Sequence, residues 1–280
     1  MGSIGRGFRL AKASWGVVRS DKELLLLPLL SFLSVLLVSA VFALGAFGIG
    51  LPKQGESPSP ALYVLGFCAY VVLSFVTIFF NAAVIGTAMK RLKGEDARIS
   101  DGLALARAHV GKIFVWAIIT ATVGMILRAV QERAGIVGRI VVAIIGVGWN
   151  VITFFVVPVL LYEEAGAVDA IKRSASLFKQ RWGEQFIGNA TIGIAMFLIA
   201  IPVVLLGVAL AAAVPIVGAI FLVVAIGGLA ALGAALSGVF NAALYRFATT
   251  GESSGAFTEE DLSSSFRPRK GRGLLGRGSA

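Results

Sequence analysis

The chain has 280 residues, of which 58% are hydrophobic and only 14% are charged. A soluble domain has about a quarter of its residues charged, so this composition excludes an ordinary soluble protein and indicates an integral membrane protein. The formal net charge is +10, and Cys68 is the only cysteine, which excludes a disulfide framework and a metal site built from cysteines.

Charged residues are missing from five long stretches, which are residues 24–52, 57–89, 113–127, 140–162 and 185–245. About 20 apolar residues cross a bilayer core. The last stretch is long enough for two crossings and has a break at residues 214–215, so we predict an all-α integral membrane helical bundle with six transmembrane helices. Their predicted ranges are residues 24–50, 61–89, 113–130, 140–162, 186–213 and 215–247. The third has the shortest uncharged run and spans only if Lys112 and Arg128 reach the two surfaces.

Basic residues are distributed unevenly between the loops of this bundle. Most of the 25 Lys and Arg residues lie in the two terminal segments and in the loops 90–112 and 163–184. The positive-inside bias therefore predicts a protein of the cell membrane with both termini in the cytoplasm. Basic residues that flank membrane helices are expected to contact anionic lipid headgroups, at about 1 kcal/mol each, and we expect no nucleic-acid partner.

Three stretches, before the first, third and fifth helices, have apolar residues on one helical face and basic residues off it. Those apolar residues are Ile4, Phe8, Ala11, Trp15 and Val18, then more weakly Ile99, Leu103, Ala106 and Val110, and finally Ile171, Ala175, Phe178 and Trp182. This pattern favours amphipathic helices in the membrane interface, with Trp15 and Trp182 as anchors at headgroup depth. The alternative is that these helices pack on one another as a cytoplasmic cap.

The second helix of each pair also carries a recurring motif. Phe80-Asn81-Ala82-Ala83 recurs at residues 240–243, and Phe79-Phe80 has a counterpart at residues 154–155. We infer a membrane domain over residues 1–250, built from three parallel repeats, each an interfacial helix followed by a membrane hairpin. The repeats cover about residues 1–90, 91–163 and 164–250, and residues 251–280 are predicted to form a disordered, basic cytoplasmic tail.

Two sequence segments carry a resemblance to a known family. These are residues 5–15, which include Gly5-Arg6-Gly7-Phe8-Arg9-Leu10 and Ser14-Trp15, and residues 21–28, Asp21-Lys22-Glu23-Leu24-Leu25-Leu26-Leu27-Pro28. Through them the chain resembles an uncharacterised prokaryotic family of six-helix membrane proteins, a domain of unknown function. Through Ala242-Ala243-Leu244-Tyr245-Arg246 it is more distantly similar to the membrane domain of some glycerophosphodiester phosphodiesterases. The resemblance implies no established activity and no catalytic residues.

Enzymatic and ion-coupled chemistry are not indicated. No ionisable residue lies at mid-depth in any predicted helix, which argues against a pump, a proton-coupled carrier or an intramembrane protease. His109 is the only histidine and lacks neighbouring ligands for a metal. The glycine pattern of residues 271–276 lacks the strand and helix that a dinucleotide site needs. We therefore expect no enzyme, no catalytic or metal-binding residues and no cofactor.

The candidate contact residues are uncharged. Asn81 and Asn241 occupy matching places in the repeat, where an amide either lines a path for a solute or forms a hydrogen bond between helices. Four small residues step by four along the last helix, and they favour close packing within the bundle or, alternatively, a homodimer seam. They are Ala230, Ala234, Gly238 and Ala242.

The sequence favours a non-enzymatic membrane scaffold or regulator that contacts lipids or a partner, including a homo-oligomer partner. The alternative is a passive carrier or channel for a small or amphipathic solute. A continuous polar cavity that contains both Asn81 and Asn241 would favour the carrier. A core closed by Ala, Gly and Leu would favour the scaffold.

Overall fold

The computed structural model describes residues 14–16, 18–19, 22–52, 56–181 and 188–252. Every regular element in these ranges is helical, in agreement with the predicted all-α class. Trp182 and nearly all of the predicted tail lie outside the described residues. The elements are η1 (Lys22–Leu25), α2 (Leu26–Ile49), α3 (Pro60–Leu92), α4 (Ile99–Ala108), α5 (Val110–Arg133), α6 (Ile136–Ile152), α7 (Val156–Tyr162), α8 (Ala167–Arg181), α9 (Gly188–Ala213) and α10 (Pro215–Thr250).

Six spans in the described part of the chain are long and apolar enough to cross a membrane. They are α2, α3, α5, α6 together with α7, residues 196–213 of α9, and α10. The predicted number of crossings is therefore confirmed by length and composition. The helix of the third span is longer than predicted, because α5 has 24 residues, about 36 Å of helix. Its uncharged run is still residues 113–127, so a crossing by this span still requires Lys112 and Arg128 to reach the two surfaces.

Local sequence explains where several spans begin and end. Ser59 caps α3 by accepting a hydrogen bond from the backbone N–H of Leu62, and Pro60 takes the first helical position, which needs no N–H donor. Pro215 begins α10 in the same way. The last helix ends at Gly251, whose φ of 76° is readily adopted only by glycine.

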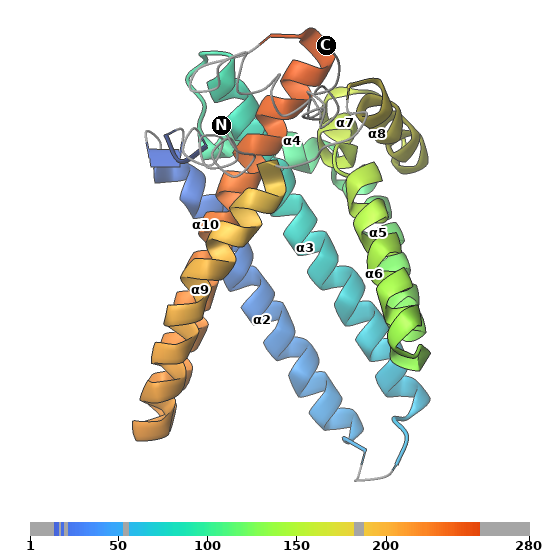
Figure 1. The fold of residues 1–280 in the computed structure, drawn as a ribbon, viewed down its shortest axis with the longest axis vertical. Coiled ribbons are helices and arrows are strands. Elements are labelled where there is room, and N and C mark those ends of the chain that lie inside the picture. Colours follow the sequence, from blue (N-terminus) through green and yellow to red (C-terminus); the bar gives the residue numbers. More distant parts are fainter. Residues whose placement is uncertain (1–13, 17, 20–21, 53–55, 182–187, 253–280) are drawn as a thin grey trace, which may run out of the picture.

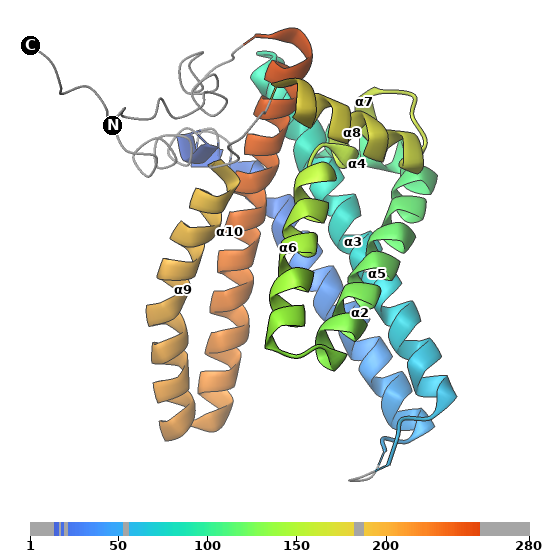
Figure 2. The same cartoon turned by 45° about the vertical axis from the view of Figure 1, so that its right-hand side comes forward.

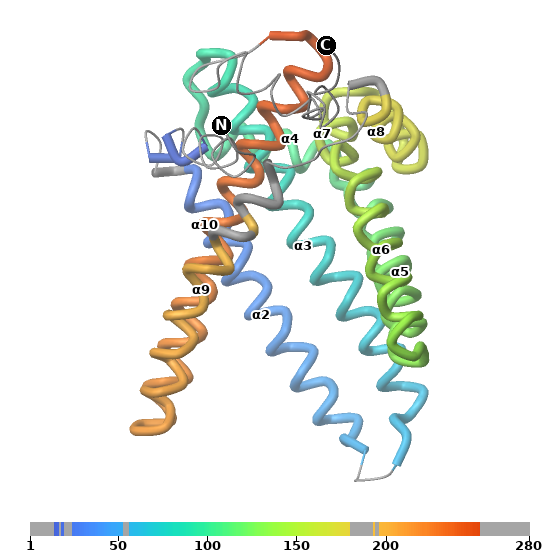
Figure 3. The backbone as a smooth tube through the Cα atoms, in the orientation of Figure 1, coloured from blue at the N-terminus to red at the C-terminus, as the bar shows by residue number. Residues whose placement is uncertain are grey.

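The long helices run in the same general direction, and the short ones gather at one end (Figures 1 and 2). We call this end, where α4, α7 and α8 lie with the start of α2 and the end of α10, the capped end. The smooth trace shows that the α9–α10 hairpin diverges from α3, α5 and α6 away from the capped end (Figure 3). The connections between α2 and α3, between α5 and α6, and between α9 and α10 lie at the opposite end.

The densest packing lies at the capped end. Three segments bury nearly all of their side chains there, residues 82–89 of α3, residues 155–161 around α7 and residues 242–248 of α10. Further along the spans, large apolar side chains face outward; Leu44 is 71% exposed and Ile216 is 75% exposed. An apolar surface of this extent is expected where helices contact lipid, not water.

The fourth span differs from its prediction as one continuous helix over residues 140–162. It begins four residues earlier, at Ile136, and it is interrupted between α6, which ends at Ile152, and α7, which begins at Val156. Two polar side chains from other helices bind the backbone at this interruption, Ser174 and Asn241. A broken helix at membrane depth is tolerated where the freed backbone groups find such partners.

The amphipathic segments α4 and α8 pack on the bundle at the capped end. Helix α8 buries Ala167, Ala170, Ser174 and Leu177. The last three each precede a residue of the predicted apolar face by one position, so the buried face is rotated by about 100° from the predicted one, whose Ile171 and Phe178 are only half-buried. The helix α4 buries Gly102 and Ala106. The position of these helices in the membrane interface and the division into three hairpin repeats stay predictions.

Candidate functional site

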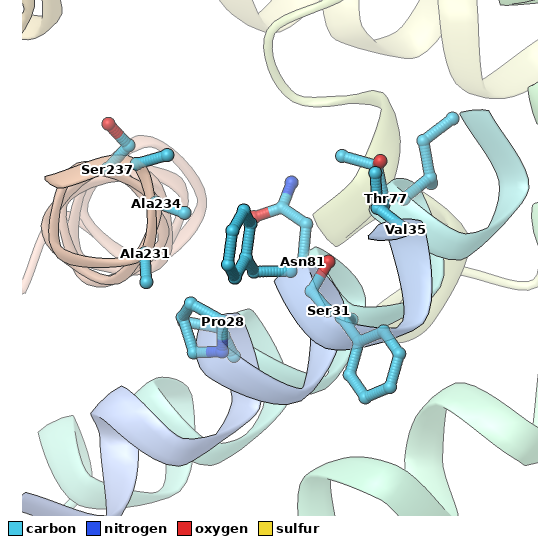
Figure 4. Close-up of a pocket in the computed structure, with 13 residues that line it drawn as sticks. Pro28, Ser31, Val35, Thr77, Asn81, Ala231, Ala234 and Ser237 are labelled. Carbon is cyan, nitrogen blue, oxygen red and sulfur yellow. The ribbon is translucent and has the colours of Figure 1, made fainter. Parts of the chain in front are cut away.

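A cavity of about 440 Å³ lies between α2, α3 and α10, and its lining residues place it beside the buried segments of the core, away from the capped end. Figure 4 shows the side chains that line it. We call it the α2–α3–α10 cavity. Helix α2 contributes Pro28, Ser31, Phe32 and Val35, a spacing that puts all four on one helical face. Helix α3 contributes Thr77, Ile78, Phe80, Asn81 and Val84, and α10 contributes Ala230, Ala231, Ala234 and Ser237. The lining is mostly apolar, and it contains no charged residue.

The polar residues of the cavity lie at similar distances from the capped end along their three helices. Ser31, Asn81 and Ser237 are each about nine residues, or about 13 Å, from the nearest basic residue along the chain at the capped end. Those basic residues are Lys22, Lys90 and Arg246. With a hydrocarbon core about 30 Å thick, three helices therefore bring a polar side chain to the same depth.

Asn81 projects into the space between α10 on one side and α2 on the other (Figure 4). Among the residues that the structure describes, none forms a hydrogen bond with the side chain of Asn81, Ser31 or Ser237. Thr77 differs, because its hydroxyl donates to the carbonyl O of Leu73 in its own helix at 2.9 Å. The cavity therefore offers an amide and two hydroxyl groups for interaction with a ligand.

Asn241, the counterpart of Asn81 in the repeated motif, does not line this cavity. Its side-chain Nδ2 donates to the carbonyl O of Phe154 at 2.9 Å, in the interruption between α6 and α7. Its Oδ1 is buried without a hydrogen-bond partner among the described residues. The structure therefore separates the two asparagines, because Asn81 lines the α2–α3–α10 cavity and Asn241 binds the interruption of the fourth span.

Ser174 completes the binding of the interruption from the side of α8. Its hydroxyl donates to the carbonyl O of Ile152 at 2.5 Å and accepts a hydrogen bond from the backbone N–H of Phe155 at 3.0 Å. The residue is fully buried. One hydroxyl thus binds both ends of the break, a role that the sequence did not suggest because Ser174 lies off the predicted apolar face of its helix.

The four small residues of α10 divide between two environments. Gly238 and Ala242 are buried, and a Cβ added at Gly238 would lie 2.6 Å from Cγ1 of Val84, so this glycine lets α10 approach α3. Ala230 and Ala234 are exposed and line the cavity. The row therefore packs closely in its half near the capped end and faces the cavity in the other half, and its use as a contact surface stays a prediction.

A polar cluster at the capped end links α7, α8 and α10. The Glu163 carboxylate accepts hydrogen bonds from Nε of Arg173, at 2.9 and 3.1 Å, and from the hydroxyl of Tyr245 at 3.1 Å. Arg246 binds the carbonyl O of Leu92 at the end of α3. These bonds tie helix ends together, and each group has a structural partner.

Asp101 anchors the start of α4 to α3. Its carboxylate accepts a hydrogen bond from the backbone N–H of Arg98 at 3.1 Å and lies 3.2 Å from Nζ of Lys90. The backbone hydrogen bond from Arg98, followed by the interaction with Lys90, lowers the pKa of Asp101 below its ordinary value. Nδ1 of His109 lies 2.9 Å from the carbonyl O of Leu105 at the α4–α5 junction, a structural contact.

Trp15 and Cys68 are both exposed in the described part of the chain. Trp15, in the described segment at residues 14–16, is 42% exposed, as an interfacial anchor requires, while the depth of its ring in a membrane stays a prediction. Within the described residues, no group of three or more His, Cys, Asp or Glu side chains is placed to hold a metal ion. Cys68 is exposed on α3 and is a free thiol.

Six spans with an apolar outer surface, together with an uncharged cavity between three of them, define a multi-pass helical membrane protein. Residues 60–256, more than half of the chain, match a family of unknown function, DUF6159, and the chain belongs to that family. No curated protein and no solved structure matches the chain. The family match lies beyond residues 5–28, on which the predicted resemblance mainly rested, and it links the chain neither to glycerophosphodiester phosphodiesterases nor to a prokaryotic source.

Proposed function

We propose that this protein is a non-enzymatic scaffold or regulator of the cell membrane, with both termini in the cytoplasm and with lipids or a protein as its partners. The observation that carries the proposal is the closed core at the capped end. Ala82, Ala83, Ala242 and Ala243 are almost completely buried there, and Phe155 fills the space beside them. A core closed by small and apolar side chains leaves no polar route along the bundle axis.

The hydrogen bonds of the capped end support the same conclusion. Asn241, Ser174 and Glu163 bind groups within the protein, at a helix interruption or between helix ends. Exposed basic residues near these helices, such as Lys93 after α3 and Lys179 on α8, are available to anionic headgroups. This arrangement supports a stable platform at the cytoplasmic surface, on which α4 and α8 lie in the interface and the three hairpin repeats form the membrane part.

The alternative is a passive carrier or channel for a small or amphipathic solute. One observation favours it, the α2–α3–α10 cavity with the free amide of Asn81 near mid-membrane. The cavity is closed toward the capped end by Val84, which is 1% exposed. Transport would therefore require a rearrangement of the contact between α3 and α10, whereas a scaffold role requires none.

Flux measurements in proteoliposomes test the proposal. Purified protein in phosphatidylcholine vesicles is expected to release entrapped potassium ions and carboxyfluorescein no faster than protein-free vesicles. A control that contains a known pore confirms that release is measurable in the same vesicles. Reproducible release that disappears in Asn81→Leu would replace the scaffold with the carrier.

A further inference from the structure

We propose that the α2–α3–α10 cavity is a binding site for a neutral lipid, an uncharged molecule with one hydroxyl- or carbonyl-bearing head and a long apolar chain. The head lies beside the amide of Asn81, and the chain lies along the face of α10 formed by Ala230 and Ala234. This inference goes beyond the scaffold role, which needs no ligand in the cavity.

The size and lining of the cavity fit such a ligand. Its volume of about 440 Å³ falls within the range of about 300–1,000 Å³ that is typical of small-molecule sites. Such sites combine a mostly apolar lining with a few placed polar groups. Here Phe32, Val35 and Ile78 supply apolar surface, and Asn81, Ser31 and Ser237 supply uncharged hydrogen-bonding groups.

Charge and depth select against an ionic lipid. No charged residue lines the cavity, and its polar groups lie about 13 Å from the basic residues of the capped end. A phosphate or ammonium headgroup at that depth would lose its hydration without a compensating ion pair, which costs several kcal/mol. A hydroxyl or carbonyl group costs much less to bury, and a hydrogen bond with the Asn81 amide offsets that cost.

A second hollow explains where a long chain can extend. It has a volume of about 470 Å³ and lies between α9 and α10, where Met196, Phe197 and Gly233 line it. The two hollows share Ala230 and Ser237 in their linings. An apolar chain that is too long for the α2–α3–α10 cavity can therefore continue past Ala230 into the hollow beside α9.

Photo-crosslinking in vesicles of phosphatidylcholine tests the assignment with a defined probe, a diacylglycerol that carries a diazirine in one acyl chain. The full-length protein is irradiated, and the labelled positions are mapped by peptide mass spectrometry. We expect labels to concentrate on the cavity-lining residues of α2, α3 and α10. Excess unlabelled diacylglycerol should reduce the labelling several-fold, and the same excess of anionic phosphatidylglycerol should leave it unchanged.

Three variants locate the site. Ala234→Phe fills the cavity and Asn81→Leu removes the amide, so each should lower the labelling several-fold. Val224→Phe, at a position on α10 that is 65% exposed outside the lining, adds the same bulk and should not change it. Size-exclusion chromatography and melting in detergent confirm that each variant is folded.

The competition experiments use the unaltered protein, so they test the proposed lipid site even if Ala234→Phe does not fold. Labels spread evenly over the exposed faces of all spans, or equal competition by phosphatidylglycerol, would overturn the proposal in favour of ordinary annular lipid. Either result would leave the flux test of the scaffold unaffected, because that test measures release of solutes.

Discussion

Helices α3 and α10 both carry the motif Phe-Asn-Ala-Ala. The pair nevertheless has different structures in its two halves, one near the capped end and one toward mid-membrane. Near the capped end the helices are in close contact, and Asn241 is engaged by the broken fourth span. Toward mid-membrane the helices line a cavity, and Asn81 projects into it. The comparison shows that Phe-Asn-Ala-Ala does not define a role by itself, because the neighbouring helix decides whether the amide receives a partner.

A difference of one methyl group accompanies the change from contact to cavity. Gly238 has no side chain and lies against Val84, whereas Ala234, one turn earlier, is exposed to the cavity. The fourth span reaches Asn241 through the carbonyl group of Phe154 but does not contribute to the cavity lining. Pairs of substitutions, one in each half, therefore test whether the two halves differ in packing and hydrogen bonding as the structure indicates.

The largest difference in the free energy of unfolding is expected between the variants Ser174→Ala and Ser31→Ala. Loss of the Ser174 hydroxyl leaves the carbonyl O of Ile152 and the N–H of Phe155 without this partner, and each buried unsatisfied group costs about 1–3 kcal/mol. Ser31 has no such bond, so its variant should change the free energy of unfolding by less than about 0.5 kcal/mol. Unfolding by SDS in mixed micelles measures both. Equal losses of stability would contradict the structural role of Ser174.

A smaller but clear difference in the free energy of unfolding is expected between the variants Gly238→Ala and Ala234→Leu. The new methyl group at position 238 would lie 2.6 Å from Cγ1 of Val84, and overpacking of this kind costs about 1–3 kcal/mol. Leucine at position 234 enters the cavity and should change the free energy of unfolding by less than about 0.5 kcal/mol. The same SDS titration applies. A stable Gly238→Ala would show that α10 does not approach α3 this closely.

The third pair of variants replaces the two asparagines with leucine. Asn241→Leu removes the hydrogen bond to the carbonyl O of Phe154, and hydrogen bonds between membrane helices contribute about 0.6 kcal/mol on average and about 1.7 kcal/mol at most. Asn81→Leu removes no such bond and should leave stability unchanged within about 0.5 kcal/mol, while it lowers lipid labelling. Melting in detergent and the photo-crosslinking yield separate the two effects. A larger loss of stability from Asn81→Leu would reverse the assignment of the two residues.

Composition and the distribution of charge were sufficient to predict the class of the fold. Uncharged runs of membrane length predicted six spans, and residues 215–247 differ from the observed α10 mainly at its last turn. The interruption of the fourth span has a signal in the sequence, Pro158, which has no N–H to donate to the carbonyl O of Phe154 four residues earlier and whose ring disfavours a regular helix there. Its partners, Ser174 and Asn241, come from distant parts of the sequence and meet it only in the folded bundle.

The candidate site was predictable only in part. Uncharged polar residues are rare enough in membrane helices that Asn81 and Asn241 stood out, yet their sequence context is the same and cannot separate a cavity from a hydrogen bond. The row of small residues indicated close approach of helices, but the point at which α10 leaves α3 depends on the relative angle of the two helices. Ser237, like the asparagines, is an uncharged polar residue inside a predicted membrane helix, whereas the sequence does not single out Ser31.

The smallest expected effect is a change of stability with pH. It should arise at the capped end, where Asp101 is charged, and not at the cavity, which has no titratable residue in its lining. The pKa of Asp101 is lowered in the folded protein, so the stability that its carboxylate contributes is complete above the ordinary aspartate pKa of about 3.9 and is lost as the pH falls through the lower folded value. The carboxylate is exposed, so the effect is small and decreases with added salt. The difference in melting temperature between the unaltered protein and Asp101→Asn should therefore be largest above about pH 5 and shrink below about pH 4.

The α2–α3–α10 cavity supplies the internal control for this experiment. No titratable residue lines it, so crosslinking of the diacylglycerol probe should be the same at pH 7 and at about pH 4, where a neutral head also keeps its charge state. A melting difference that stays constant from pH 7 down to about pH 2, well below the ordinary aspartate pKa, would show that Asp101 does not hold α4 on α3. Labelling that changes with pH while the protein stays folded would show that an ionisable group takes part in binding, which the lining of the cavity does not contain.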